Sequence, residues 1–369
     1  MATYTEDMIA RITLAALTEP GDPITGQLIK AIGIAETVQL IRDPGAAIPS
    51  SVDPLKGIRW RQQAAARQKD TLTDDLIALT EQHGLRLLTP GRAGWPVDVA
   101  DLGDASPILL WAKGNPELLT SSLTSRVTIT GARAATGYGV HVTRELAARL
   151  AESPRILVSG GAYGIDAETH RAALATRPGS TIAVLAGGMD RPYPRAHESL
   201  FDRIVDEGGL LVSELPPGFS PTRGRFIARA RLLAALSGVT VIPEAGFRSG
   251  SLWVASNTYD LGRQLGAVPG PITSAASAGC HRLLRDDMAV PVTSAADVLE
   301  LTDPHPTGSL LGRHYERILH RITDPSVAAA QRTDVEQRLA TDSLRQRRLG
   351  NPDLGDDDPA GHTGPARTL

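Results

Sequence analysis

The stretch ILVSGGAYGIDAETHRAALATRPGSTIAVLAGG, residues 156–188, contains two short apolar runs that each end in glycines. A short run rich in β-branched residues is typical of a strand buried on both faces of a sheet. The longer stretch between the two runs is typical of a helix that crosses from one strand to the next, parallel strand. Residues 156–188 therefore predict one unit of a parallel sheet.

The same alternation extends over the chain from Arg126 to about Leu301. Its other short runs are VTIT (127–130), LLVSE (210–214), VTVIPEA (239–245) and GAVPG (266–270). Between the first two strand-like runs, residues 138–151 place apolar side chains on one helical face, as a crossover helix requires. We therefore expect a doubly wound α/β core.

The regions around this core have different patterns. Residues 1–83 mix short helical patterns with Pro-rich breaks and predict a small helical domain. Residues 84–304 hold the core, which begins with a bridging segment over 84–115. Residues 305–369 predict one amphipathic helix and a disordered tail rich in Gly, Pro and Asp.

Composition limits the classes of function. Of 369 residues, 41% are hydrophobic, which is enough for a large core, and Cys280 is the single cysteine. We expect a buried thiol there, no disulfide, no metal site and a reducing compartment. No leader pattern or long apolar run is found, so we expect a cytoplasmic protein without membrane contact. The net charge of −3 means that any nucleic-acid site depends on a local cluster of cations.

Glycine-rich loops follow three of the predicted strands. In open parallel sheets ligands bind where strands end, and free N–H groups at helix starts attract phosphate. The glycines could equally serve only to permit tight turns. No loop has the spacing of a dinucleotide fingerprint or a P-loop, so we expect no cofactor. The three loops are Gly131-Ala132-Arg133, Ser159-Gly160-Gly161 with the residues to Asp166, and Gly187-Gly188-Met189-Asp190.

A basic segment lies over residues 219–250. Its acidic side chain is Glu244, and its arginines are Arg223, Arg225, Arg229, Arg231 and Arg248. Arg225 and Arg229 share a helical face with Phe226 beside them, so guanidinium groups could hold phosphates while the ring stacks on a base. We expect Arg229 and Phe226 at the surface. The alternative is that these arginines form a solvated face or cover apolar surface with their stems.

Three polar residues could be mistaken for a catalytic triad. Ser159, Asp166 and His170 lie in one stretch, but the Gly-x-Ser-x-Gly elbow of such enzymes is missing. We expect Asp166 to orient its loop and His170 to pack on its helix, and we predict no catalytic residue.

Six ordered motifs extend from the first of these loops to Cys280. They are Thr130-Gly131-Ala132-Arg133, Ser159-Gly160-Gly161-Ala162-Tyr163-Gly164-Ile165-Asp166 with His170, Ala186-Gly187-Gly188-Met189-Asp190 with Tyr193-Pro194, Ser213-Glu214-x-Pro216-Pro217-Gly218, Glu244-Ala245 with Arg248-Ser249-Gly250-Ser251, and Val268-Pro269-Gly270-Pro271-Ile272 with Gly279-Cys280. In this order and spacing, over roughly Gly84 to Leu301, the chain resembles the DprA/Smf family of DNA-processing proteins.

The resemblance implies a Rossmann-like core that binds and protects single-stranded DNA. It also implies help in loading the RecA recombinase during natural transformation, a homodimer, and no hydrolytic or redox activity. The N-terminal region is similar to the sterile-alpha-motif-like domain of this family.

Carried over by position, the resemblance gives the residues of a DNA site. Arg133 and Phe226 would act with loop amides, and Arg231 and Arg248 are further candidates. The other positions are Gly131, Ser159, Gly160, Gly161, Arg223, Arg229, Ser249 and Gly250. Two departures are Ala230, where the family commonly has asparagine between two arginines, and the lack of a winged-helix pattern after residue 304.

Two alternatives remain open on the sequence. Phosphoribohydrolases have similar strand-end glycines, but the Pro-Gly-Gly-x-Gly-Thr-x-x-Glu signature is replaced by residues 243–251, without its glutamate. A nucleotide-sensing scaffold would bind a mononucleotide, whose affinity depends weakly on salt, whereas a strand that contacts several phosphates depends steeply on it.

Overall fold

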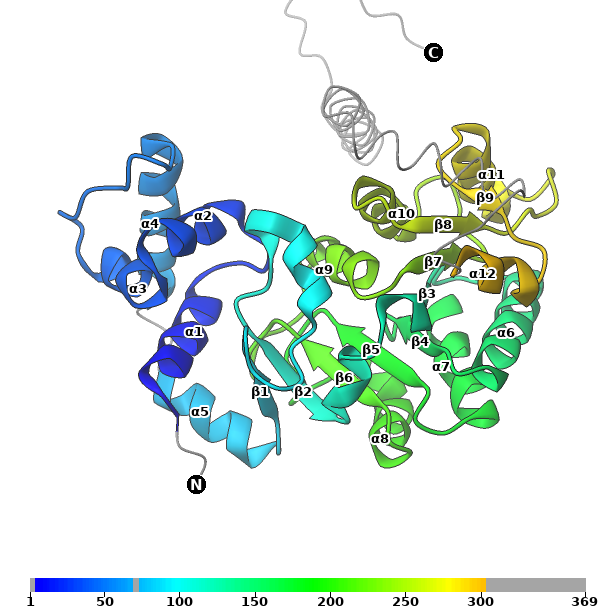
Figure 1. Cartoon of the computed structure of the whole chain (residues 1–369), viewed down its shortest axis with the longest axis horizontal. Coiled ribbons are helices and arrows are strands. Elements are labelled where there is room, and N and C mark those ends of the chain that lie inside the picture. Colours follow the sequence, from blue (N-terminus) through cyan, green and yellow to red (C-terminus); the bar gives the residue numbers. More distant parts are fainter. Residues whose placement is uncertain (1–3, 69–72, 303–369) are drawn as a thin grey trace, which may run out of the picture. The chain divides into compact units, whose positions relative to one another are not determined.

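The computed structural model describes residues 4–68 and 73–302 (Figure 1). The predicted helix and tail over 305–369 and the predicted lack of a winged helix lie outside these residues. Within the two described ranges, every helix is too short or too polar to cross a lipid bilayer.

Nine strands form one sheet in the described part of the chain, in the order β1-β2-β6-β5-β4-β3-β7-β8-β9. All neighbours from β6 to β9 are parallel, whereas β1 and β2 are antiparallel additions at one edge. The prediction of a doubly wound, Rossmann-like core is confirmed. The strands are β1 (Arg86–Leu88), β2 (Leu110–Gly114), β3 (Arg126–Ile129), β4 (Ile156–Ser159), β5 (Thr181–Leu185), β6 (Leu210–Ser213), β7 (Val239–Ile242), β8 (Gln264–Ala267) and β9 (Val290–Pro291).

The central strands are buried on both faces because successive side chains point to opposite sides. In β4, Ile156 and Val158 join the apolar cluster with α9 (Arg223–Ala235) and α10 (Ser251–Asp260). Leu157 joins the cluster on the other face. There the sheet is covered by α6 (Gly137–Glu152), α7 (Ile165–Thr176), α8 (Glu198–Asp206) and α12 (Ala295–Leu301) (Figure 1).

The predicted buried thiol is present. Cys280 lies on α11 (Ala278–Arg285) with no exposed surface, packed among residues from β7 and β8. Burial raises the pKa of this thiol to about 12, so it stays protonated and inert at neutral pH.

The bridging segment over 84–115 adds β1 and β2 to the sheet. Trp111 of β2 is fully buried and its Nε1 donates a hydrogen bond to Thr80 Oγ1 at 3.1 Å. Short 3₁₀ turns complete the connections, at η1 (Val97–Ala105), η2 (Pro116–Leu119), η3 (Leu123–Ser125), η4 (Arg195–His197) and η5 (Ala275–Ser277).

In the described residues before β1 there are five helices, and α1 belongs to two cores. Leu14 and Leu17 pack with α2–α4, while Ala15 and Ala16 pack with Trp111 at the sheet edge. The helical region is thus attached to the sheet through α1. Its helices are α1 (Glu6–Leu17), α2 (Pro23–Ile32), α3 (Ile34–Arg42), α4 (Pro54–Gln68) and α5 (Thr73–Gln82).

Trp111→Ala tests this attachment. Because the indole is fully buried and hydrogen-bonded, its removal should lower the free energy of unfolding by about 4 kcal/mol in urea titrations. Val97→Ala, at a side chain that is 76% exposed, is the control and should change it by less than about 0.5 kcal/mol. An equally small change in Trp111→Ala would contradict this packing.

Candidate nucleic-acid interface

The carboxyl ends of the parallel strands gather the predicted site residues at one edge. Gly131 and Arg133 follow β3, residues 159–161 lie at and just after the end of β4, α9 begins after β6, and residues 248–250 follow β7. The chain reverses its direction of strand addition between β3 and β7, which is the switch point where ligands of such sheets usually bind.

Arg229 is buried, so the expectation that it lies at the surface is wrong. Its Nη1 donates hydrogen bonds to the backbone oxygens of Gly160 at 2.6 Å and Val184 at 2.8 Å. The reason is that Arg229 lies on the sheet-facing side of α9, where β4 and β5 end in free carbonyl groups. Burial lowers the pKa of the guanidinium, and the carboxylate of Asp166 opposes that shift.

Gly160 is required by this contact. A Cβ added at residue 160 would lie 2.0 Å from Arg229 Nη1. Ser159, Gly160 and Gly161 are all buried, and Ser159 Oγ donates to Ile129 O at 2.7 Å. These three residues were expected to offer donors to phosphate, and their burial means instead that they shape the support of the loop.

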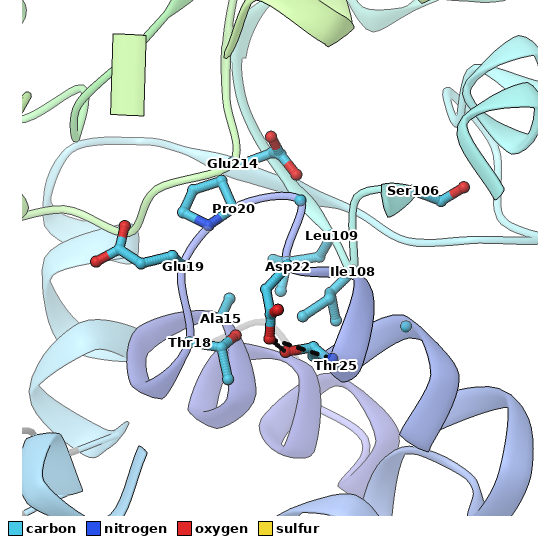
Figure 2. A pocket seen from close by; sticks show the side chains of 12 residues that line it. Ala15, Thr18, Glu19, Pro20, Asp22, Thr25, Ser106, Ile108, Leu109 and Glu214 are labelled. Carbon is cyan, nitrogen blue, oxygen red and sulfur yellow. Dashed lines mark hydrogen bonds between the residues drawn. The ribbon is translucent and has the colours of Figure 1, made fainter. Parts of the chain in front are cut away.

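Arg231 also points inward. Its Nη1 lies 2.6 Å from Glu214 Oε2 in a buried ion pair, and its Nε donates to Ala105 O at 2.8 Å. A Cβ at Gly21 would meet Arg231 Nε at 2.5 Å, so the α1–α2 turn lies against the guanidinium. Figure 2 shows Glu214 beside this turn, among the residues that line a small pocket. Arg231 therefore joins the helical region to the sheet and does not lie with the exposed candidates.

Phe226 and Arg133 form an accessible pair. The guanidinium carbon of Arg133 lies 4.5 Å from the centre of the half-buried Phe226 ring, and that of Arg229 lies 5.8 Å from it. The Tyr193 ring contacts Phe226 edge-on, with 5.8 Å between ring centres. This group, which we call the Phe226 platform (Arg133, Tyr193 and Phe226), combines an exposed cation with aromatic surface.

Two exposed tyrosines were missed as site residues. Tyr163 is 45% and Tyr193 is 48% exposed, and both stand in the loops after strands. Tyr163 contacts His197 edge-on at 4.8 Å between ring centres. The available signal was an aromatic residue inside two of the strand-end motifs, but their exposure depends on neighbouring loops.

The charges exposed on these loops are positive. Among the described residues of the connections after β3 to β7 and at the start of α9, the exposed charged side chains are Arg133, Arg191, Arg195, Arg223 and Arg248, and the exposed Glu198 follows as the first residue of α8. The acids of the same loops are buried or act as internal acceptors. Asp190 accepts from Gly218 N at 2.8 Å, and Asp166 from Thr130 Oγ1 at 2.7 Å. The edge is thus locally cationic although the chain carries a net charge of −3.

The carboxylate of Glu244 occupies the switch point between β3 and β7, beside the N-terminus of α6. It accepts hydrogen bonds from Thr136 N at 2.8 Å and Thr136 Oγ1 at 2.6 Å, at the start of α6. A Cβ at Gly139 would lie 2.5 Å from its Oε2. A carboxylate therefore takes the place beside the helix N-terminus where the phosphate of a nucleotide would bind. This geometry disfavours both nucleotide-pocket alternatives.

The remaining candidates have mixed placements. Arg248 and Gly250 are exposed, whereas Ser249 Oγ is hydrogen-bonded to Ser251 Oγ at 2.8 Å. Arg225 Nε donates to Glu19 Oε2 at 3.1 Å. In place of the asparagine common in the family, Ala230 is 2% exposed and packs in the apolar cluster under α9, so the departure changes a buried position.

Comparisons with known proteins agree with this architecture. Residues 86–303 match the family model of DNA recombination-mediator protein A. The chain is 42% identical over 298 residues to a putative DNA processing protein DprA of Mycobacterium tuberculosis, covering 78% of this chain and 73% of the relative.

Two solved structures are similar. The X-ray structure of DNA processing protein A from Streptococcus pneumoniae matches with a TM-score of 0.63 and 29% identity, over 82% of this chain and all of that one. A structure of DNA processing protein A from Helicobacter pylori, described by its single-stranded DNA binding mode, matches with a TM-score of 0.53 and 30% identity, over 58% of this chain and 94% of that one.

Arg229→Ala should destabilise the fold. The substitution leaves two buried carbonyl groups without their charged donor, which should cost about 3 kcal/mol of unfolding free energy in urea titrations. Arg223→Ala, at an exposed position of the same helix, should cost less than about 0.5 kcal/mol. Equal stability of the two variants would show that Arg229 is not a structural residue.

His170 should make stability depend on pH. Burial lowers its pKa from 6.5 to about 3, with smaller contributions from His197, Arg171 and Arg229. Below pH 6.5 the unfolded chain takes up a proton that the folded chain does not, so the histidine lowers stability as pH falls from 6.5 towards 3. His170→Gln should therefore lose less unfolding free energy than the wild type when pH is lowered through this range. Parallel pH profiles for the two proteins would contradict the burial of a neutral imidazole.

Proposed function

Because the chain belongs to the DNA recombination-mediator protein A family, the DprA/Smf proteins, we propose that it binds single-stranded DNA at the carboxyl edge of its sheet. The observation that carries this proposal is the Phe226 platform, where a guanidinium and two aromatic rings meet at the surface. The similar Helicobacter pylori protein, which is described by its single-stranded DNA binding mode, supports this proposal through its similarity in sequence and fold.

The platform fits an unpaired strand. Bases of a single strand are free to stack on Phe226 and Tyr193, whereas duplex bases already stack on each other. Arg133, Arg191, Arg223 and Arg248 would hold successive phosphates. Stacking and phosphate contacts read no base edges, so binding should be tolerant of sequence and sensitive to salt.

The role is binding and not catalysis. Ser159, Asp166 and His170 are buried and hydrogen-bonded to neighbouring groups of the protein, which supports structural roles for them. Family membership supports protection of incoming DNA and loading of a RecA recombinase during natural transformation. A cytoplasmic homodimer is the form we propose on the same ground.

Phe226→Ala tests the proposal. Loss of one stacked base should weaken binding of a labelled oligo-dT strand about tenfold in fluorescence anisotropy, since stacking on an aromatic side chain contributes about 1–3 kcal/mol per base. Arg133→Ala should lower the salt slope of the logarithm of the binding constant by about 0.7, the value for one phosphate contact in a single strand.

Arg149→Ala is the matched control. Arg149 is 64% exposed and lies in the last turn of α6, away from the carboxyl ends of the strands. Its loss should leave affinity and salt slope unchanged. Wild-type affinity in Phe226→Ala and Arg133→Ala, with both variants folded by circular dichroism, would refute the proposed surface.

A further inference from the structure

A groove in the helical region adjoins the basic end of α9. It lies between the α1–α2 turn and α4, has a volume of about 300 Å³, and is lined among others by Glu19, Asp22, Lys56, Arg59 and Arg67.

One face of α4 supplies the cations of the groove. Lys56, Arg59, Gln63 and Arg67 follow one another at intervals of three or four residues and therefore share a side of the helix. The helix, Pro54–Gln68, contains no Asp or Glu. Its rise gives about 16 Å from the first to the last of these residues, which is room for a few nucleotides.

A shared carboxylate connects this face to the Phe226 platform. Glu19 Oε1 lies 2.8 Å from Arg67 Nη2, and Glu19 Oε2 lies 3.1 Å from Arg225 Nε. Both guanidinium groups therefore lie beside one side chain, although they come from different regions of the fold. Arg225 immediately precedes Phe226 in α9, so the cations continue from the sheet edge to α4.

The acidic side chains that line the groove, Glu19 and Asp22, already form ion pairs or hydrogen bonds within the protein. Glu19 is shared between Arg67 and Arg225, while Asp22 caps α2 by accepting from Thr25 N at 3.2 Å and Thr25 Oγ1 at 2.6 Å (Figure 2). Lys56 and Arg59 are exposed, and within residues 4–68 and 73–302 neither forms an ion pair with an acid. Their charges are therefore available to an anionic ligand.

We infer that a single strand bound at the Phe226 platform continues past Arg225 and Arg67 into the α4 groove, where Lys56 and Arg59 contact its phosphates. This inference rests on the proposed function and extends it, because it makes the N-terminal helical region part of the DNA surface. Its consequence is that affinity increases with strand length until the strand reaches α4.

The double variant Lys56→Ala/Arg59→Ala tests this path in the full chain. Labelled dT strands of about 6 and about 20 nucleotides are titrated by anisotropy between 0.1 M and 1 M salt. For the long strand, two lost phosphate contacts should lower the salt slope by about 1.4, which corresponds to about a 25-fold loss of affinity at 0.1 M relative to 1 M salt. For the short strand, the variant should bind as the wild type does.

Arg42→Ala/Arg86→Ala is the control, because it removes the same charge from exposed positions that do not line the groove. It should leave the affinity for both strands unchanged.

If the groove variant keeps wild-type affinity for the long strand, or if the control loses as much affinity, the path along α4 is wrong while the proposal for the Phe226 platform stands. If the wild type binds neither strand, the proposed function fails and this inference with it. Equal losses on both strands would also overturn it, since α4 would then act without regard to length.

Discussion

The burial of one guanidinium group constrains the whole carboxyl edge. Arg229 carries a charge that cannot be left without acceptors in the interior, and the ends of β4 and β5 provide them through the carbonyls of Gly160 and Val184. These bonds hold α9 against the strand ends and exclude any side chain at residue 160. Phe226, one turn earlier on α9, is thereby held beside Arg133. The geometry of the proposed binding surface thus depends on an arginine that itself lies beneath it.

The basic segment consequently has two functions that its sequence does not separate. Arg229 and Arg231 organise the interior, since one binds strand-end carbonyls and the other joins the helical region to Glu214. Arg223 and Arg248 remain exposed at the edge. Because the acids of the same loops are used internally, a chain with a small negative net charge still presents a cationic edge. Placement of charge, and not its sum, makes the surface suitable for a phosphate backbone.

Much of the fold could be predicted because it depends on periodicity. Short apolar runs that alternate with crossover helices specify a parallel sheet wherever they occur. The pairing of β2 with β6 could not be predicted. Trp111 pairs with Ser213, which is about a hundred positions away, and no local sequence pattern indicates a pairing over that distance. Within the site, Phe226 was predicted from its residue type and its place in the basic segment, and Arg133 from the family resemblance. The burial of Arg229 was not, since a sequence places it on a helix without showing which carbonyls face it. The place of Tyr163 and Tyr193 was missed as well, since their ring partners His197 and Phe226 lie in other segments of the chain.

In the proposed complex a short single strand lies on the aromatic and arginine groups at the carboxyl ends of the strands. Ultraviolet cross-linking of a dT strand of about 6 nucleotides to the protein, followed by mass spectrometry of the peptides, locates the strand directly. We expect adducts in peptides that carry Tyr163, Tyr193 or Phe226, and their loss when an excess of uncross-linked dT competes. Adducts confined to the opposite edge of the sheet, near Arg149 at the end of α6, would contradict it.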